Sequence, residues 1–224
     1  MKMIRPAVIA LVVIGFCGPA LFAQDLAKYR NFSFGMSAAA VSKRVEQRPA
    51  DVVVIHEQPA LIQELTWYPP PPFQSGRPAE PVQKVLFSFY NGELYRLLVT
   101  YDSEAIKGLT NEDMTRVLSE KYGTASTPVA EVDFPTSDSY RATEKVIARW
   151  EDTQYSVNLF RSSIPDTFAV VMFTKRMDAQ AATSIAESVK LKQEEAPRME
   201  AARVRQAAID LEVQRQKNIK VLRP

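Results

Sequence analysis

Cysteine, histidine and glycine are scarce in this chain: among its 224 residues there are one Cys, one His and seven Gly. A zinc site built from several His or Cys ligands is therefore excluded, because the side chains that would bind the metal are absent. The sequence also lacks a Gly-rich phosphate-binding loop, a Gly-x-Ser-x-Gly nucleophile motif and an Asp-rich loop with calcium-binding spacing. These absences predict a protein that uses neither a metal nor another cofactor.

The overall composition is that of an ordinary globular protein. Apolar residues make up 46% of the chain, and 28 basic residues stand against 26 acidic ones. A wholly disordered or collagen-like chain is excluded by these values. The length accommodates one or two domains, each with its own hydrophobic core.

The N-terminus has the pattern of a secretory signal peptide. Lys2 and Arg5 precede the apolar run Ala7–Phe16, Gly18-Pro19 then breaks the helix, and Leu21-Phe22-Ala23 offers a cleavage site. This arrangement predicts a signal peptide over residues 1–23, with cleavage before Gln24 and a periplasmic or secreted mature protein.

Two alternatives for this segment remain open. A membrane anchor would need roughly 20 apolar residues, which is longer than the run Ala7–Phe16. A lipoprotein would be acylated on Cys17, but Phe16 is bulky where such signals favour a small residue.

Cleavage would change the charge balance. Without Lys2 and Arg5 the basic residues would equal the 26 acidic residues, and without Cys17 no cysteine would remain. A neutral chain offers no electrostatic reason to bind nucleic acid. Its stability must come from a hydrophobic core, because no disulfide is available.

Two segments of the body share one pattern, which indicates an internal repeat. Residues 35–45 and 108–118 both run Gly, Met or Leu, Ser or Thr, and then place apolar residues at helical spacing. Ser37 and Thr110 occupy the positions of helix N-caps. Asp113 lies three residues after Thr110, which is the acidic position of a capping box. Gly123 supplies a stop for the second helix.

Each predicted helix is followed by a hairpin. Residues 85–90 and 93–99 flank Asn91-Gly92, a strong signal for a tight turn between strands. Residues 146–151 and 154–160 flank Asp152-Thr153, where Thr is unsuited to positive φ and predicts a different turn type. Further strands are expected at 61–68 and 167–173.

The predicted fold class is therefore α+β, with two repeated helix-plus-antiparallel-sheet units followed by a long C-terminal helical extension. The expected divisions are a signal peptide at 1–23, a duplicated domain at 24–176 with units of about 33–102 and 106–176, and the extension at 177–224.

On Gly35-Met36-Ser37, Gly108-Leu109-Thr110, Trp67 and the hairpins, the chain resembles small envelope domains of the SmpA/OmlA type. The doubling also resembles the β-lactamase-inhibitor proteins, whose disulfides this chain lacks. The resemblance implies an interaction role in the bacterial envelope. It carries over no functional residue.

Few side chains suggest catalysis. His56 is expected to be a partly exposed strand residue, since neighbouring Glu57 would point to the opposite face of a strand. Paired carboxylates could support glycoside hydrolysis, and the candidates near strand ends are Glu64, Asp102, Glu104, Glu151 and Asp152. A hydrolase of this kind would require Glu64, Asp102 or Glu151 to converge in one cleft.

A proline-rich segment at 69–81 has two interpretations. Four consecutive prolines favour polyproline II and cannot lie inside a sheet. With Trp67, Tyr68 and Phe73 beside it, the segment could recognise a partner. The alternative is a long hairpin loop between strands 61–68 and 82–90.

The C-terminal segment 178–222 consists mainly of strong helix formers. Ala182, Ile185, Ala186 and Val189 are expected to form an apolar stripe on the sheet. Pro197 either kinks one long helix or opens a second one. Beyond it Ala201, Val204, Ala208 and Leu211 form a short seam, which indicates either a solvated helix or a partner-binding one.

The function expected from the sequence is non-enzymatic binding of another envelope macromolecule. The expected partner is another protein or a second copy of this chain, bound through the C-terminal helix. The alternatives are the carboxylate hydrolase and binding of a small apolar ligand between helix and sheet. The candidate binding residues are Trp67, Tyr68 and Phe73.

Overall fold

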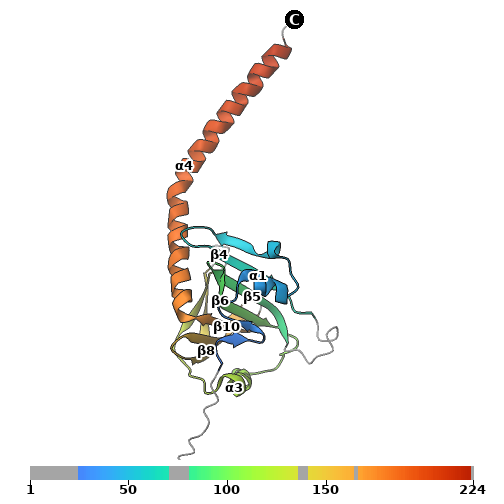
Figure 1. Cartoon of the computed structure of the whole chain (residues 1–224), viewed down its shortest axis with the longest axis vertical. Coiled ribbons are helices and arrows are strands. Elements are labelled where there is room, and N and C mark those ends of the chain that lie inside the picture. The colour runs from blue at the N-terminus through green and yellow to red at the C-terminus, as the bar shows by residue number, and fades with distance from the viewer. Residues whose placement is uncertain (1–24, 71–80, 136–140, 164–165, 223–224) are drawn as a thin grey trace, which may run out of the picture.

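An antiparallel sheet organises the chain in a computed structural model, which describes residues 25–70, 81–135, 141–163 and 166–222 (Figure 1). Within these residues the sheet has eight strands in the order β3-β4-β5-β6-β10-β9-β8-β7. The strands are β3 (Val53–His56), β4 (Ile62–Trp67), β5 (Val82–Tyr90), β6 (Glu93–Tyr101), β7 (Glu131–Pro135), β8 (Arg141–Glu151), β9 (Tyr155–Ser163) and β10 (Asp166–Thr174). The expected α+β class is confirmed.

The sheet has two halves that meet at β6 and β10. In the first half β3, β4, β5 and β6 are neighbours in chain order, and in the second half β7, β8, β9 and β10 are. Helix α1 (Ala38–Arg44) precedes the first half, and α3 (Asn111–Tyr122) precedes the second. The smaller elements are β1 (Lys28–Tyr29), β2 (Phe32–Ser33) and the 3₁₀ turn η1 (Pro49–Asp51).

Both predicted helix starts are confirmed by their caps. The Ser37 hydroxyl accepts a hydrogen bond from the backbone N–H of Ala40 at 3.2 Å. Thr110 accepts from the N–H of Asp113 at 3.2 Å, and the Asp113 carboxylate accepts from the N–H of Thr110 at 3.1 Å. This reciprocal pair is a capping box. Gly123 ends α3 at a φ of 79°.

The main core lies on the face of the sheet that carries α1 and α3. Alternate strand residues point to this face because successive side chains of a strand point to opposite sides. Val85, Phe87, Leu97, Val99 and Trp150 are 1% exposed or less and belong to one cluster with Met114 and Leu118 of α3. The opposite face is left for the C-terminal helix.

The C-terminal extension is one helix, α4 (Lys175–Val221), with Pro197 inside it. The expectation of a long helix is confirmed, and of its two forms the structure shows the continuous one. Figure 1 shows α4 running beside the sheet, bending, and then projecting away from the body. Proline inside a helix removes a backbone hydrogen bond and clashes with the preceding turn, which accounts for a bend in this region.

Candidate functional site

The first turns of α4 pack on the sheet through small and polar residues. Ala181, Ser184 and Ser188 are buried at 1%, 9% and 3% exposure, and Ala181 joins a cluster with Ile62 of β4 and Tyr95 of β6. The predicted stripe was wrong in part: Ile185 is half-buried against this cluster, whereas Ala182 and Ala186 are exposed and Val189 is 45% exposed. The buried positions have the predicted 3-4 spacing but lie one residue earlier. Two of them are serines, which a search for apolar residues does not find.

An ion pair fixes the start of α4 on the sheet. Nη1 of Arg96 in β6 donates to Oδ1 of Asp178 at 3.0 Å, and the side chains are 11% and 23% exposed. Burial raises the pKa of the Asp178 carboxyl, and Arg96 opposes this effect. Burial also raises the pKa of Glu64, which Arg96 and a hydrogen bond with Ser88 oppose. The docking of α4 therefore depends on buried charges as well as on apolar area.

A second polar contact joins α4 to β3 at the edge of the sheet. Oγ of Ser188 lies 2.8 Å from Nδ1 of His56, and Nζ of Lys192 lies 3.3 Å from the same nitrogen. His56 is partly exposed in a strand, as expected. Its contact with Ser188 was not predicted, because 132 residues separate the two in sequence.

This Ser–His pair does not have the surroundings of a catalytic nucleophile. Ser188 lies inside α4, where backbone N–H groups donate along the helix and are not available to stabilise an oxyanion. Burial and the nearby Lys192 charge lower the pKa of His56, which makes it a weaker base. The contact is better explained as a polar attachment of the helix.

We expect this attachment to weaken in acid. The pKa of His56 is lowered below 6.5 in the folded protein, so at pH values under 6.5 the unfolded chain binds the proton more strongly. The contribution of His56 to stability is therefore complete above 6.5 and is lost as the pH falls through the depressed folded value. Glu57 and Glu195 line the same shallow pocket and Lys192 faces the ring, so a matched variant is required.

The measurement is urea unfolding of the natural protein and of His56→Gln at about pH 7.5 and about pH 5. Taking the difference between the free energies of unfolding of the two proteins at each pH cancels the titration of Asp178, Glu64 and the other carboxylates. The natural protein should lose more stability than the variant on acidification. Equal losses in the two proteins would contradict the assignment.

A cleft of about 370 Å³ lies between α4, the sheet and β7. Its floor is formed by β6, β8, β9 and β10, and its two walls by α4 and β7. The lining side chains used below are Arg96, Arg149, Asn158 and Phe173 from the floor, with Ile185 and Val132 from the walls. The volume of this cleft falls in the range of small-ligand sites, and its walls carry the charged side chains Asp178 and Glu131 beside apolar ones.

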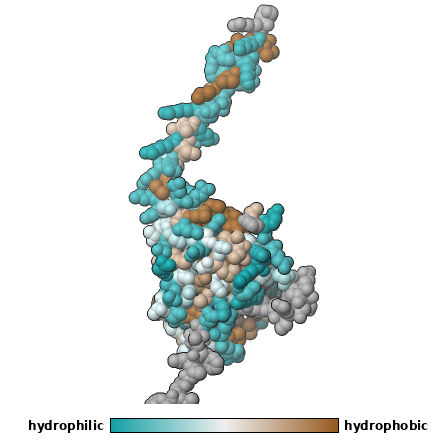
Figure 2. Space-filling view, viewed as in Figure 1, coloured by the Kyte–Doolittle hydropathy of each residue, from teal (hydrophilic) through white to brown (hydrophobic). Residues whose placement is uncertain are grey.

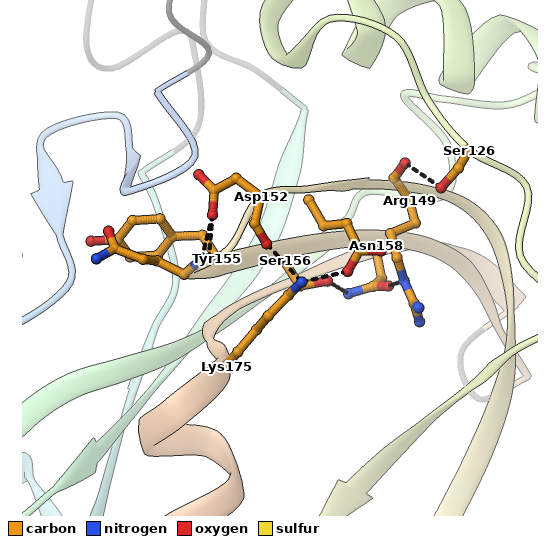
Figure 3. Close-up of polar contacts among 9 residues, drawn as sticks. Ser126, Arg149, Asp152, Tyr155, Ser156, Asn158 and Lys175 are labelled. Carbon is orange, nitrogen blue, oxygen red and sulfur yellow. Dashed lines mark hydrogen bonds and ion pairs between the residues drawn. The ribbon is translucent and has the colours of Figure 1, made fainter.

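Strand register places the polar groups of the floor side by side. Asn158 of β9 pairs with Val171 of β10 on one side and with Arg149 of β8 on the other. Nε of Arg149 donates to Oδ1 of Asn158 at 2.6 Å, and Nδ2 of Asn158 donates to Oγ of Ser156 at 3.0 Å (Figure 3). Ser156 and Asn158 are 2% and 0% exposed. Sequence analysis did not single out these residues, although two buried polar residues alternating in an apolar strand are a usable signal.

The carboxylates of the hydrolase alternative each have a local partner. Oδ1 of Asp102 accepts from the backbone N–H groups of Glu104 and Ala105, both at 3.0 Å. Oδ1 of Asp152 accepts from the N–H groups of Gln154 and Tyr155, at 2.7 and 2.6 Å. These contacts are those of turn residues.

Glu151 and Glu64 lie far apart in the sheet. Glu151 forms an ion pair with Lys175 at 2.8 Å at the end of β8, and Glu64 lies in β4. Four strands separate β4 from β8. With strands about 4.8 Å apart, this arrangement does not give the carboxyl separation of roughly 5–10 Å that glycosidases use. Neither residue lines the cleft described above.

The aromatic candidates have different environments. Trp67 is half-buried, with its ring centroid 5.8 Å from that of Phe32, so it packs on the core. Tyr68 is 66% exposed. Phe73 and most of the segment 69–81 lie outside the described residues, although the flanking strands β4 and β5 are antiparallel neighbours.

In the described part of the chain, no group of three or more His, Cys, Asp or Glu side chains could hold a metal ion. Among the same residues, no helix combines the length and apolar character needed to cross a bilayer. The predicted signal peptide at residues 1–23 lies outside the described residues.

Comparisons with known proteins give a distant likeness in structure and none in sequence. No protein-family model matches the sequence, and no curated protein matches it. A cysteine-rich secretory protein from Staphylococcus aureus matches in structure with a TM-score of 0.34 and 9% sequence identity. The match covers 64% of this chain and 44% of the staphylococcal one, so this chain spans less than half of that protein's length. A likeness at this level assigns no function.

Proposed function

We propose that this is a non-enzymatic protein of the bacterial periplasm or exterior that binds another envelope macromolecule through the projecting part of α4. The observation that carries the proposal is the exposure of this part. Every residue from Val189 to Leu222, here called the arm, is exposed, and Figure 1 shows the arm extending away from the body. Because none of its residues is buried, the arm is expected to add little to the stability of the body.

The arm is suited both to standing alone and to docking. Ion pairs along the helix, such as Glu200 with Arg203 at 2.8 Å and Glu212 with Arg215 at 3.3 Å, support it without a partner. It also exposes large apolar side chains that would gain from burial, namely Met199, Val204, Ile209 and Leu211, which are 57–72% exposed.

An apolar surface lies where the arm leaves the body. Val53 and Val54 of the edge strand β3 are 57% and 45% exposed, and Leu191 of the arm is 40% exposed. Val54 and Leu191 line one shallow pocket. Figure 2 shows apolar residues gathered at this end of the body, beside the helix. Exposed apolar residues gathered in one region are typical of an interaction site.

The finer architecture supports the same proposal. We infer that units 33–102 and 106–176 are repeats, because each contains a capped helix followed by four strands in the same order. The duplication is the basis of the resemblance to the β-lactamase-inhibitor proteins, and Gly35-Met36-Ser37, Trp67 and the hairpins are the basis of the resemblance to SmpA/OmlA-type domains. Both resemblances imply an interaction role.

The proposed location rests on the signal-peptide pattern of residues 1–23. The exported protein should begin at Gln24 and remain soluble after cell disruption without detergent. Intact-mass measurement of the exported form tests this expectation. A retained N-terminus or a lipid on Cys17 would contradict it.

Crosslinking in the native envelope tests the binding proposal. A photoreactive residue replaces Leu211 on the arm, and in a matched protein it replaces Leu109, which is 41% exposed on the body. Leu211 should give one discrete crosslinked species, either with a second copy or with another envelope component, and Leu109 should not. Equal yields at the two positions would contradict a role for the arm.

A second candidate function is binding of a small ligand between helix and sheet. The observation that favours it is the cleft of about 370 Å³ between α4 and the strands. The apolar side chains of its walls, Val132 and Ile185, would contact such a ligand. The hydrolase alternative has no comparable support, because its carboxylates have separate structural roles.

A further inference from the structure

The floor of the cleft contains a buried polar chain that packing alone does not require. Ser156, Asn158 and Phe160 alternate along β9 on one face, and Phe160 belongs to an apolar cluster with Val171. Ser156 and Asn158 are as buried as Phe160. Burying an amide and a hydroxyl is costly unless they are hydrogen-bonded, so apolar residues would serve packing better. The polar chain therefore suggests a role other than packing, at the open end where it reaches the cleft.

That open end is the guanidinium of Arg149. Asn158 accepts from Nε of Arg149 at 2.6 Å, and Ser156 accepts from the amide nitrogen of Asn158 at 3.0 Å. The bond to Nε fixes the plane of the guanidinium, and Figure 3 shows its terminal nitrogens extending beyond Asn158. Among the residues that the structure describes, these two nitrogens donate to no acceptor.

The other charges of the cleft are arranged differently. Arg96 is paired with Asp178 at 3.0 Å, so these two side chains largely cancel. Glu131, on the β7 wall, is exposed to solvent. Arg149 is thus a positioned cation whose two parallel N–H groups match the geometry of a carboxylate.

We propose that the cleft binds an amphipathic monoanion, a carboxylate on a short apolar chain. The carboxylate accepts two hydrogen bonds from the terminal nitrogens of Arg149, and the apolar chain lies against Phe173, Val132 and Ile185. This inference rests on the second candidate function, ligand binding in the cleft, and adds the charge of the ligand.

The probes are octanoate and octanol, which share an alkyl chain and differ in the carboxylate. Calorimetric titration of the full-length protein should show one octanoate site and binding of octanol that is weaker by about tenfold or more, as expected for a charge-assisted pair of hydrogen bonds. Arg149→Gln should lower octanoate affinity by a similar factor and leave octanol unchanged.

The matched control is Arg161→Gln. Arg161 lies on β9 as well, but its guanidinium pairs with Asp166 at 2.6 Å and is 54% exposed. Octanoate affinity should be the same in this variant as in the natural protein. Circular dichroism of both variants shows that they fold, and Arg149→Lys offers a second test, since it keeps the charge but loses the planar pair of donors.

The outcomes distinguish failure of the anionic-ligand inference from failure of ligand binding in the cleft, on which it rests. Equal binding of octanoate and octanol, or octanoate binding that Arg149→Gln does not weaken, would overturn the anionic ligand but leave a cleft for apolar molecules. Absence of binding by both probes would overturn the anion site and the ligand-binding function together.

Discussion

Replacing Trp150 by alanine should lower the free energy of unfolding by about 3–5 kcal/mol, the range typical of Trp→Ala in a packed core. The side chain is 1% exposed in β8. Its Nε1 donates to the carbonyl of Gly123 at 2.9 Å, and its ring centroid lies 6.0 Å from that of Tyr122. The substitution would open a cavity between α3 and the sheet and remove the donor for the carbonyl that ends α3. Urea unfolding measures the change.

The matched control for this prediction is Trp67→Ala. Trp67 is half-buried at the end of β4, so it removes less packed surface. The loss at position 67 should be clearly smaller than the loss at position 150. A larger loss at position 67 would mean that the core is centred elsewhere.

Replacing Asp178 by alanine should destabilise the protein by about 3 kcal/mol, because it removes a carboxylate that forms an ion pair with the buried Arg96 guanidinium. The value lies at the lower end of the range for broken buried pairs, since Glu64 also acts on Arg96 and remains in place. The loss should be accompanied by faster amide exchange in the first turns of α4, which this ion pair holds on the sheet.

A double variant separates the pair from its burial cost. Arg96→Met with Asp178→Leu removes both charges and keeps apolar volume, so it should lose much less stability than Asp178→Ala. If the double variant loses as much as the sum of the two single variants, the residues do not act as a pair.

Local chemistry accounts for what the sequence predicted well. Asn91 and Gly92 adopt φ values of 51° and 83°, as a tight turn between β5 and β6 requires. The turn at Asp152-Thr153 is built differently, on the Asp152 carboxylate and the N–H groups of Gln154 and Tyr155. Helix caps and turns depend on a few adjacent residues, so their signals can be recognised in a single chain.

Contacts between distant segments account for the features that the sequence did not predict. Arg96 and Asp178 are 82 residues apart, and nothing in the sequence near either residue indicates the other. The face of α4 that meets the sheet is set by Ala181, Ser184 and Ser188, whose small side chains permit close approach but carry little apolar signal. The short edge strand β7 was also missed, because five residues are too few to establish an alternating pattern.

The cleft could be predicted only in part. The strands of its floor were expected, but alternation does not say which face a terminal helix will cover. The partnership of Arg149 with Asn158 follows from the register of β8 and β9. That register includes a shift between Val146 and Ala148, which the sequence does not indicate.

The central claim is that the arm binds and does not support the body, and the melting temperature of a protein lacking residues 198–224 tests it most directly. All described residues of this segment are exposed, so the deletion removes no buried side chain from the body. The melting temperature should stay within about 2 °C of the natural protein, while self-association or capture of the envelope partner weakens. A fall of more than about 4 °C would correspond to a loss of roughly 1 kcal/mol or more and would show that the arm stabilises the body.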